Sequence, residues 1–171
     1  GAEINVSNVN IANVAADKKF AVWVDEDAAA HADKVVVNGA YKAVENVPSD
    51  IIANPSELAS ATIKDGSTIY LVAAGDYAIP AAAKGKTLTI KGTEDVAITV
   101  NKPNLDGGNL TLDGVTVKAS GKYTGVQHVN TVTYNNAKIV GEMCLYGEKV
   151  VFNGCEFVLS AGQYIWTYGA K

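Results

Sequence analysis

The sequence predicts an all-β protein whose second half is wound into a solenoid of short strands. Three observations lead to this fold class. Apolar residues make up 48% of the 171 positions and charged residues 19%, which is enough apolar surface for an ordered core. A pattern of alternating apolar residues recurs between positions 88 and 157. A pair of residues rich in Gly and Asn stands at the same place in each copy.

The repeated unit consists of two short strands joined at a corner. Apolar and polar residues alternate on both sides of the corner, and alternation with a period of two is typical of a β-strand. Gly and Asn accept positive φ at low cost, so a pair of them at a fixed position predicts a repeated sharp turn. The four copies are Leu88–Gly92, Leu110–Val117, Val132–Ile139 and Val150–Phe157, with corners at 91–92, 113–114, 135–136 and 153–154.

A third short strand follows later in the unit, at 126–128, 144–146 and 166–168. Units of about 20 residues with three short strands and fixed corners describe successive coils of a β-solenoid. Stacking of these coils predicts two inward-facing columns of side chains. The first column is Leu88, Leu110, Val132 and Val150, and the second is Ile90, Leu112, Tyr134 and Phe152.

The segments 56–65, 66–72, 74–77 and 86–92 resemble the start of the right-handed parallel β-helix family, which has the pectin-lyase-like fold. The resemblance covers about residues 50–171, and it implies a right-handed, single-stranded parallel β-helix over 51–171 with a capping helix over 56–65. The repeats also resemble those in surface and secreted proteins of gut Bacteroidetes. This second resemblance implies a bacterial chain, outside the cell or on its surface, whose signal peptide has been removed.

The residues of the segment 56–65 support a helix on physical grounds. Ser56 is a favourable N-cap, and Glu57 in the first turn suits the helix dipole. Asp65-Gly66 is a suitable stop. A helix here would cover the strand edges of the first coil, and an ordinary surface helix is the alternative. The apolar stripe of the helix would consist of Leu58, Ala61, Thr62 and Ile63.

The first fifty residues lack the regular spacing of the repeat. They contain three strand-like stretches, at 4–11, 20–24 and 34–39. Two interpretations stay open: a small antiparallel β-unit in which 20–24 and 35–38 form a hairpin, and irregular first rungs of the same solenoid. We favour a separate β-unit over 1–50, joined to the solenoid over 51–171 through residues 44–50.

Charge and composition exclude several classes of function. All 14 basic residues are Lys, and 18 acidic residues give a net charge of −4, which does not suit a surface that follows nucleic-acid phosphates. No apolar run approaches the roughly 20 residues of a membrane-spanning helix. Neither metal-ligand spacing nor a phosphate-binding loop occurs, so we expect no metal and no cofactor. Whether Cys144 and Cys155 form a disulfide stays open.

The resemblance raises the question of an enzyme, because the β-helix family includes polysaccharide lyases and glycosidases. The chain has no Arg, and it lacks the motifs Asn-Thr-Asp, Asp-Asp, Gly-His-Gly and Arg-x-Lys of the related hydrolases. Glycoside hydrolysis needs two facing carboxylates roughly 5–9.5 Å apart, for which Asp106 and Asp113 are candidates. Asp113 stands at the repeated corner, where turn chemistry explains it. We therefore expect no catalytic residue.

One column of residues on the third strands is a candidate binding site. The repeat places His128, Tyr146 and Tyr168 in register, with Val126, Cys144 and Trp166 two residues earlier. Neighbouring rungs lie about 4.8 Å apart, so aromatic rings on an outer face would form a flat strip suited to sugar rings. The alternative, which we slightly favour, places Trp166 and its column in the interior stack. The candidate binding residues are His128, Tyr146, Tyr168 and Trp166.

The sequence thus predicts a non-catalytic extracellular or cell-surface β-solenoid module that binds glycans or acts as an adhesin. One alternative is a fragment of a polysaccharide lyase or glycoside hydrolase, and another is a module of a phage or appendage fibre. The run Tyr164–Tyr168 completes the last coil, and no helix or charged segment follows to cover its edge. We expect self-association through this C-terminal rung and a natural protein that continues with further rungs.

Overall fold

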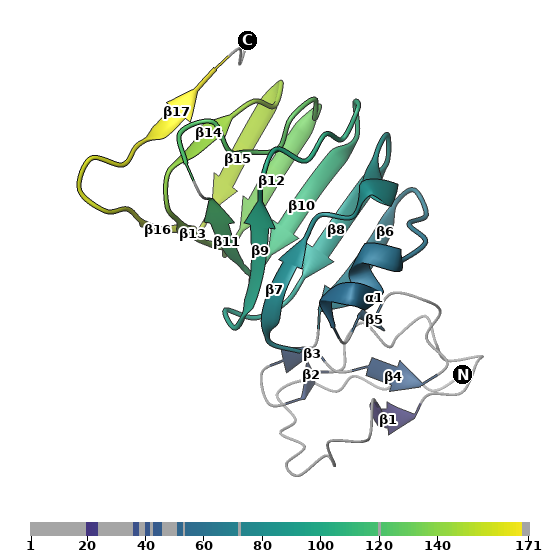
Figure 1. Ribbon diagram of the computed structural model, residues 1–171. Coiled ribbons are helices and arrows are strands. Elements are labelled where there is room, and N and C mark those ends of the chain that lie inside the picture. The colour runs from purple at the N-terminus through teal and green to yellow at the C-terminus, as the bar shows by residue number, and fades with distance from the viewer. Residues whose placement is uncertain are drawn as a thin grey trace.

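The computed structural model describes residues 54–168, except positions 72 and 120, and the backbone of five short strands between residues 20 and 52. Nearly all of the described elements are β-strands. Their sheets are stacked as a parallel β-solenoid of about five turns, with one short helix before the regular coils (Figure 1). The fold class predicted from the repeat is confirmed.

Two long parallel sheets form two sides of the solenoid. In both sheets each strand pairs with the corresponding strand of the neighbouring coil. The first sheet has the order β15-β12-β10-β8-β6-β5, and its strands are β5 (Ile51–Ile52), β6 (Ser67–Leu71), β8 (Thr87–Lys91), β10 (Asn109–Asp113), β12 (Thr131–Asn135) and β15 (Lys149–Asn153). The second has the order β16-β13-β11-β9-β7, with β7 (Gly75–Ala78), β9 (Val96–Val100), β11 (Thr116–Ala119), β13 (Lys138–Val140) and β16 (Glu156–Val158).

The third side of the solenoid is less regular. β14 (Met143–Leu145) pairs in parallel with β17 (Ile165–Thr167), whereas the coil before β14 contributes only an isolated bridge between Asn104 and Gln127. A short 3₁₀ turn, η2 (Ala81–Ala83), lies between β7 and β8. The third strands predicted at 144–146 and 166–168 are therefore shifted by one residue, and the strand predicted at 126–128 is reduced to the single bridge.

The two predicted inward columns match the observed register. Leu110, for example, pairs with Leu88 on one side and with Val132 on the other. The column residues on β8, β10 and β12 are at most 3% exposed, and Val150 and Phe152 on β15 are partly buried against the same core. The 22-residue spacing stacks similar apolar side chains on one another, and burial of their surface stabilises the coils.

The predicted corner is observed as well. Asn135 pairs with Asp113 in one neighbouring coil and with Asn153 in the other. The Asn153 side-chain amide donates a hydrogen bond of 2.8 Å to Oδ1 of Asn135, so the corner side chains link neighbouring coils. The second residue of the corner has positive φ in three coils, with 71° at Gly114, 48° at Asn136 and 61° at Gly154.

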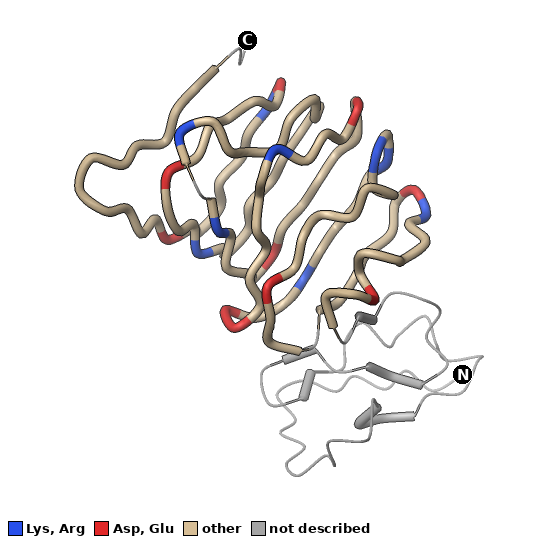
Figure 2. Tube along the Cα trace, viewed as in Figure 1, with Lys and Arg blue, Asp and Glu red and all other residues tan. Residues whose placement is uncertain are grey.

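Charged side chains lie mostly at the turns between strands (Figure 2). Three ion pairs connect charged side chains of neighbouring coils, one at a turn and two at the first or last residues of paired strands. Because these pairs lie at the surface, each contributes about 0–1 kcal/mol, and the buried columns dominate the stability. The pairs are Lys84–Asp106 at 3.2 Å, Lys138–Glu156 at 3.8 Å and Lys91–Asp113 at 4.0 Å.

The helix α1 (Pro55–Ser60) is shorter than the predicted helix over 56–65. Its N-cap is Asn54 and not Ser56, since Oδ1 of Asn54 accepts a hydrogen bond of 3.0 Å from the backbone N–H of Glu57. The Ser56 hydroxyl itself donates to the same Oδ1 at 2.6 Å. The predicted N-cap, Ser56, thus lies two residues after the observed one, Asn54.

The early end of α1 follows from the residues after it. Thr62 and Ile63 are β-branched, which lowers their helix propensity. The non-helical chain there places Ile63 in the core, where it is 2% exposed. Leu58 of α1 is fully buried in the same core, and the helix packs against β5 and β7. This packing is that of a helix covering the end of the solenoid, as the sequence predicts.

The first part of the chain contains two described strand pairs. β1 (Phe20–Trp23) pairs in parallel with β4 (Ala43–Glu45), and β2 (Val36–Val37) pairs in antiparallel with β3 (Ala40–Tyr41). The predicted hairpin between 20–24 and 35–38 is therefore wrong. Asn38-Gly39, a favoured sequence of two-residue hairpins, separates β2 from β3 and was the signal for the correct pairing. The predicted strand at 4–11 lies outside the described residues, and the boundary at residue 50 stays a prediction.

The two cysteines are free thiols. Cys144 is buried on β14, and Cys155 follows the corner of the last coil, where its Sγ donates to the carbonyl of Tyr134 at 3.2 Å. Cys144 and Cys155 therefore do not form the disulfide that the sequence left open. In the part of the chain that is described, no helix has the length and apolar composition to cross a membrane.

Candidate functional site

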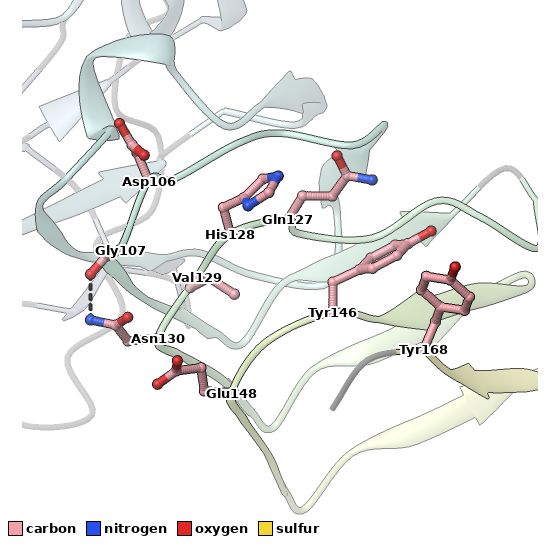
Figure 3. Close-up of a pocket in the computed structure, with 9 residues that line it drawn as sticks. All are labelled: Asp106, Gly107, Gln127, His128, Val129, Asn130, Tyr146, Glu148 and Tyr168. Carbon is pink, nitrogen blue, oxygen red and sulfur yellow. Dashed lines mark hydrogen bonds between the residues drawn. The ribbon is translucent and has the colours of Figure 1, made fainter. Parts of the chain in front are cut away.

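A surface pocket of about 660 Å³ lies on the third side of the solenoid. Three of the four candidate binding residues, His128, Tyr146 and Tyr168, line it together (Figure 3). The fourth candidate, Trp166, is not among the lining residues. The complete lining is Asp106, Gly107, Gln127, His128, Val129, Asn130, Tyr146, Glu148 and Tyr168.

The two tyrosines are brought together by the pairing of β14 with β17. Tyr146 directly follows β14 and Tyr168 directly follows β17, and the Tyr168 N–H donates to the Leu145 carbonyl at 3.3 Å. Their ring centroids lie 6.2 Å apart with an angle of 69° between the planes. The rings therefore form an edge-to-face corner and not the flat strip that equal spacing suggested.

Tyr146 is held in a fixed orientation. Its hydroxyl donates a hydrogen bond of 3.0 Å to the backbone carbonyl of Tyr123. Burial, and then a hydrogen bond with Cys144, raise the pKa of the Tyr146 hydroxyl above its ordinary value. At neutral pH the hydroxyl is therefore a neutral donor, and the ring presents a fixed apolar surface to the pocket.

His128 reaches the pocket through an irregularity of the backbone. It has a φ of 51°, and its carbonyl accepts a hydrogen bond of 2.7 Å from the N–H of Gly107. Val126 and Val129 on either side are buried in the core, whereas the His128 side chain is exposed. The left-handed residue thus turns outward between two inward-facing valines.

This irregularity corrects the predicted column of Val126, Cys144 and Trp166. Cys144 does pair with Trp166, but its N–H donates to the carbonyl of Thr124, which makes Gly125 its neighbour in the preceding coil. The preceding coil contains one residue more than the next between this point and the first sheet. Val126 therefore lies in the core, and the interior column that we favoured from the sequence does not exist as one stack.

Polar side chains surround the aromatic corner. Asp106 lies on one side of the pocket, where it forms the ion pair with Lys84, and Glu148 lies on another (Figure 3). The Asn130 side chain donates a hydrogen bond of 2.5 Å to the carbonyl of Gly107, which connects the two coils below the pocket. Gln127 contributes an amide between His128 and the tyrosines. The pocket thus combines two aromatic rings with carboxylate, amide and imidazole groups.

Trp166 belongs to a separate cluster. Its indole N–H donates to a carboxylate oxygen of Glu142 at 2.5 Å, and Nζ of Lys122 lies 3.8 Å from the centre of its ring. The ring of Tyr164 packs against it edge to face, with centroids 5.6 Å apart. These three contacts occupy Trp166 within the protein, so it is not part of the pocket surface.

The two carboxylates considered for glycoside hydrolysis do not face each other. Asp106 precedes β10 and Asp113 ends it, and a five-residue strand spans about 13 Å between its first and last residues. Each carboxylate instead pairs with a lysine of the neighbouring coil, Asp106 with Lys84 and Asp113 with Lys91. Within the described residues, no group of three or more His, Cys, Asp or Glu is placed to hold a metal ion.

Sequence reasoning missed the polar part of the pocket. Asn130 and Glu148 each stand one residue before a strand of the first sheet, so they share one phase of the repeat. Aligning the polar residues by this phase, in addition to the apolar ones, would have placed them beside the tyrosines. Asp106 also shares a phase of the repeat, since it stands 22 residues before His128, and the alignment that found the candidate column extends to it. Gln127 had no such signal, because the residues at its phase in the neighbouring coils, Leu105 and Leu145, are apolar.

Comparison with known protein families, with curated proteins and with solved structures finds no match to this chain. The parallel β-solenoid therefore rests on the structure itself. The assignment of His128, Tyr146, Tyr168 and Trp166 to binding stays a prediction.

Proposed function

We propose that this chain is a non-catalytic, extracellular or cell-surface β-solenoid module that binds a glycan on its third side. The observation that carries the proposal is the pocket in which Tyr146, Tyr168 and His128 meet the carboxylates of Asp106 and Glu148. The resemblance of the repeats to pectin-lyase-like proteins and to bacterial surface proteins supports the location outside the cell and the carbohydrate class of ligand.

The chemistry of the pocket suits a sugar. A pyranose ring has an apolar C–H face and a rim of hydroxyl groups. The ring of Tyr146 offers the apolar face a surface, and Tyr168, which is 68% exposed, closes one side of it at an angle. The carboxylates accept hydrogen bonds from hydroxyls, and such charge-assisted bonds are stronger than neutral ones. A few convergent polar groups beside aromatic side chains are typical of small-molecule sites.

The orientation of Tyr146 favours binding further. Its hydroxyl is already bonded to the Tyr123 carbonyl, so little side-chain freedom is lost when a ligand packs on the ring. A ligand that requires this hydroxyl as its own donor would compete with that bond. We therefore assign Tyr146 to stacking and the polar contacts to Gln127, His128 and the two carboxylates.

Charge determines which sugars fit. Asp106 and Glu148 both line the pocket, and the chain has a net charge of −4. Uronic acids would bring a further negative charge next to these carboxylates, which costs free energy. The proposed ligand is therefore a neutral oligosaccharide and not a polygalacturonate.

The test is calorimetric titration with neutral hexasaccharides, namely cellohexaose, mannohexaose and chitohexaose, with hexagalacturonate for comparison. We expect binding of at least one neutral sugar and none of the acidic one. Tyr168→Ala should weaken binding about tenfold, which corresponds to 1.4 kcal/mol. Tyr164→Ala is the matched control, because Tyr164 is similarly exposed at 59% but packs against Trp166 outside the pocket.

Two results would contradict the proposal. The first is equal loss of affinity in Tyr164→Ala and Tyr168→Ala, which would place the sugar elsewhere. The second is the appearance of shortened or unsaturated sugars when the same hexasaccharides are incubated with the chain and analysed by chromatography. That result would favour the alternative of a polysaccharide-degrading enzyme.

A further inference from the structure

Among the described residues, the coil formed by β15, β16 and β17 is the last one and has an open strand edge. β15 and β16 stand at the ends of their sheets, and within the described residues no strand pairs with the outer edge of β15. Apolar side chains are accordingly more exposed in this last coil than in the coil before it. Phe157 on β16 is 43% exposed, whereas Ile139, its partner on β13, is fully buried. Exposed strand edges flanked by apolar side chains are sites of association.

The hydrogen bonds on the inner side of β15 show which backbone groups are free for a partner. The Lys149 N–H donates to the Asn130 carbonyl at 2.9 Å, and the Asn153 carbonyl accepts from the Asn136 N–H at 2.7 Å. In a parallel ladder, successive residues direct their backbone groups to opposite neighbours. The N–H and C=O groups of Val150 and Phe152 therefore point to the open edge.

This edge is complementary to itself. In an antiparallel pair of β15 strands centred on Val151, Val150 of each chain lies opposite Phe152 of the other. Both residues direct their backbone groups to the interface, so each such pair exchanges two hydrogen bonds. Lys149 lies opposite Asn153, so no like charges meet across the axis. We propose that two copies of this chain associate tail to tail through their last coils, around a two-fold axis at Val151.

The remaining strands of the last coil fit the same axis. A two-fold axis perpendicular to the coil reverses the order of its sides, so β16 of one copy meets β17 of the other. Both strands are three residues long, Glu156–Val158 and Ile165–Thr167. The exposed Phe157 and Val158 would then be covered by the second copy.

The opposite end of the solenoid favours a closed dimer over a filament. Figure 1 shows α1 at that end, away from β17. There the helix packs against β5 and β7, and its Leu58 is fully buried. Head-to-tail stacking would require a last coil to pair with an uncovered first coil, whereas a two-fold pair uses only the open end. This inference does not depend on the glycan pocket.

Analytical ultracentrifugation over low-micromolar to submillimolar concentration tests the pairing in solution. We expect a dimer, and we expect Val151→Lys to weaken it at least tenfold because two ammonium groups then meet at the axis. Thr133→Lys is the matched control, since Thr133 is the register partner of Val151 one coil further inside and should leave the dimer intact. Circular dichroism of both variants verifies that the β-structure is retained.

A covalent test reports the register directly. Opposite residues of a non-hydrogen-bonded antiparallel pair have Cα atoms about 4.5 Å apart, a separation that a disulfide can span. Val151→Cys should therefore form a disulfide dimer on air oxidation, and Thr133→Cys and the unmodified chain should not. A monomer at all concentrations, a trimer or larger assembly, or cross-linking that is equal in the two cysteine variants would overturn the proposal.

Discussion

Two glycines with similar backbone angles differ in how closely the neighbouring coil approaches them. Gly141 has a φ of 89°, and a Cβ atom there would overlap the carbonyl oxygen of Ala119. Gly162 has a φ of 81°, but a Cβ there would meet nothing within 4 Å. The first glycine is therefore required by close packing between coils, and the second only by its backbone conformation.

This difference predicts unequal effects of the same substitution. Gly162→Ala should lower the free energy of unfolding by about 1 kcal/mol, the cost of a left-handed residue with a Cβ. Gly141→Ala should cost at least twice as much, because the coils must also separate. Urea denaturation of the two variants measures both values. Equal destabilisation would contradict the close approach at Gly141.

The raised pKa of the buried Tyr134 hydroxyl leads to a prediction of how the free energy of unfolding depends on pH. Burial, and then Coulomb repulsion from the nearby Cys155 side chain, raise the pKa of Tyr134 above its ordinary value of 10.0. Its contribution is fully present below pH 10.0. Above that pH the unfolded chain has lost the proton and the folded protein retains it, so the free energy of unfolding falls by about 1.4 kcal/mol per pH unit.

The matched variant is Tyr134→Phe, which keeps the ring that stacks on Phe152 at 5.0 Å. Urea denaturation from neutral pH to about pH 11 should show a shallower decline for this variant than for the unmodified chain. Identical declines would mean that Tyr134 ionises equally in the folded and unfolded states.

At the scale of elements, the sequence was sufficient wherever the repeat is regular. Like residues recur every 22 positions in β8, β10 and β12, so a single alignment predicted the register of these three strands. It failed beside His128, where one coil contains an extra residue. Positive φ is uncommon outside Gly, and although Asn, Asp and His adopt it more often than other residues, the residue type alone did not show that His128 does. The predicted column that contained Val126 was wrong for this reason.

The start of α1 shows a second limit. Asn54 and Ser56 are both good capping residues, and the sequence alone does not show which side chain accepts the hydrogen bond from the N–H of Glu57. The boundary is decided by packing, since Leu58 and Ile63 must both reach the core. A longer helix and a short helix followed by an extended segment would both bury the apolar side chains at these positions, so the apolar pattern does not distinguish them.

The capping assignment leads to a direct comparison. Asn54→Ala should lower the free energy of unfolding by about 1 kcal/mol, because the Glu57 N–H loses its acceptor. Ser56→Ala removes only an exposed hydroxyl that donates to Asn54, and it should cost a few tenths of a kcal/mol at most. Thermal unfolding of the two variants distinguishes them, and a larger effect of Ser56→Ala would contradict the assignment.

At the scale of the whole molecule, the regular and irregular sides of the solenoid have different roles. The two long sheets bury the columns that stabilise the coils. The third side contains the short pair β14–β17 and the single bridge at Gln127, and the pocket lies there. Its tyrosines were found from the sequence because they share the repeat. The same alignment places Asp106 one repeat, 22 residues, before His128, so this carboxylate could be predicted from the repeat as well.

The central claim is that this pocket binds a neutral sugar. It is tested most directly by two-dimensional ¹H–¹⁵N NMR of the labelled chain during titration with the tightest binder among cellohexaose, mannohexaose and chitohexaose. We expect the largest amide shifts at Gln127, His128, Tyr146 and Tyr168, and none in the groove between α1 and β7 around Ala59 and Thr99. Shifts confined to that groove, or no shifts with any of the three sugars, would contradict the claim.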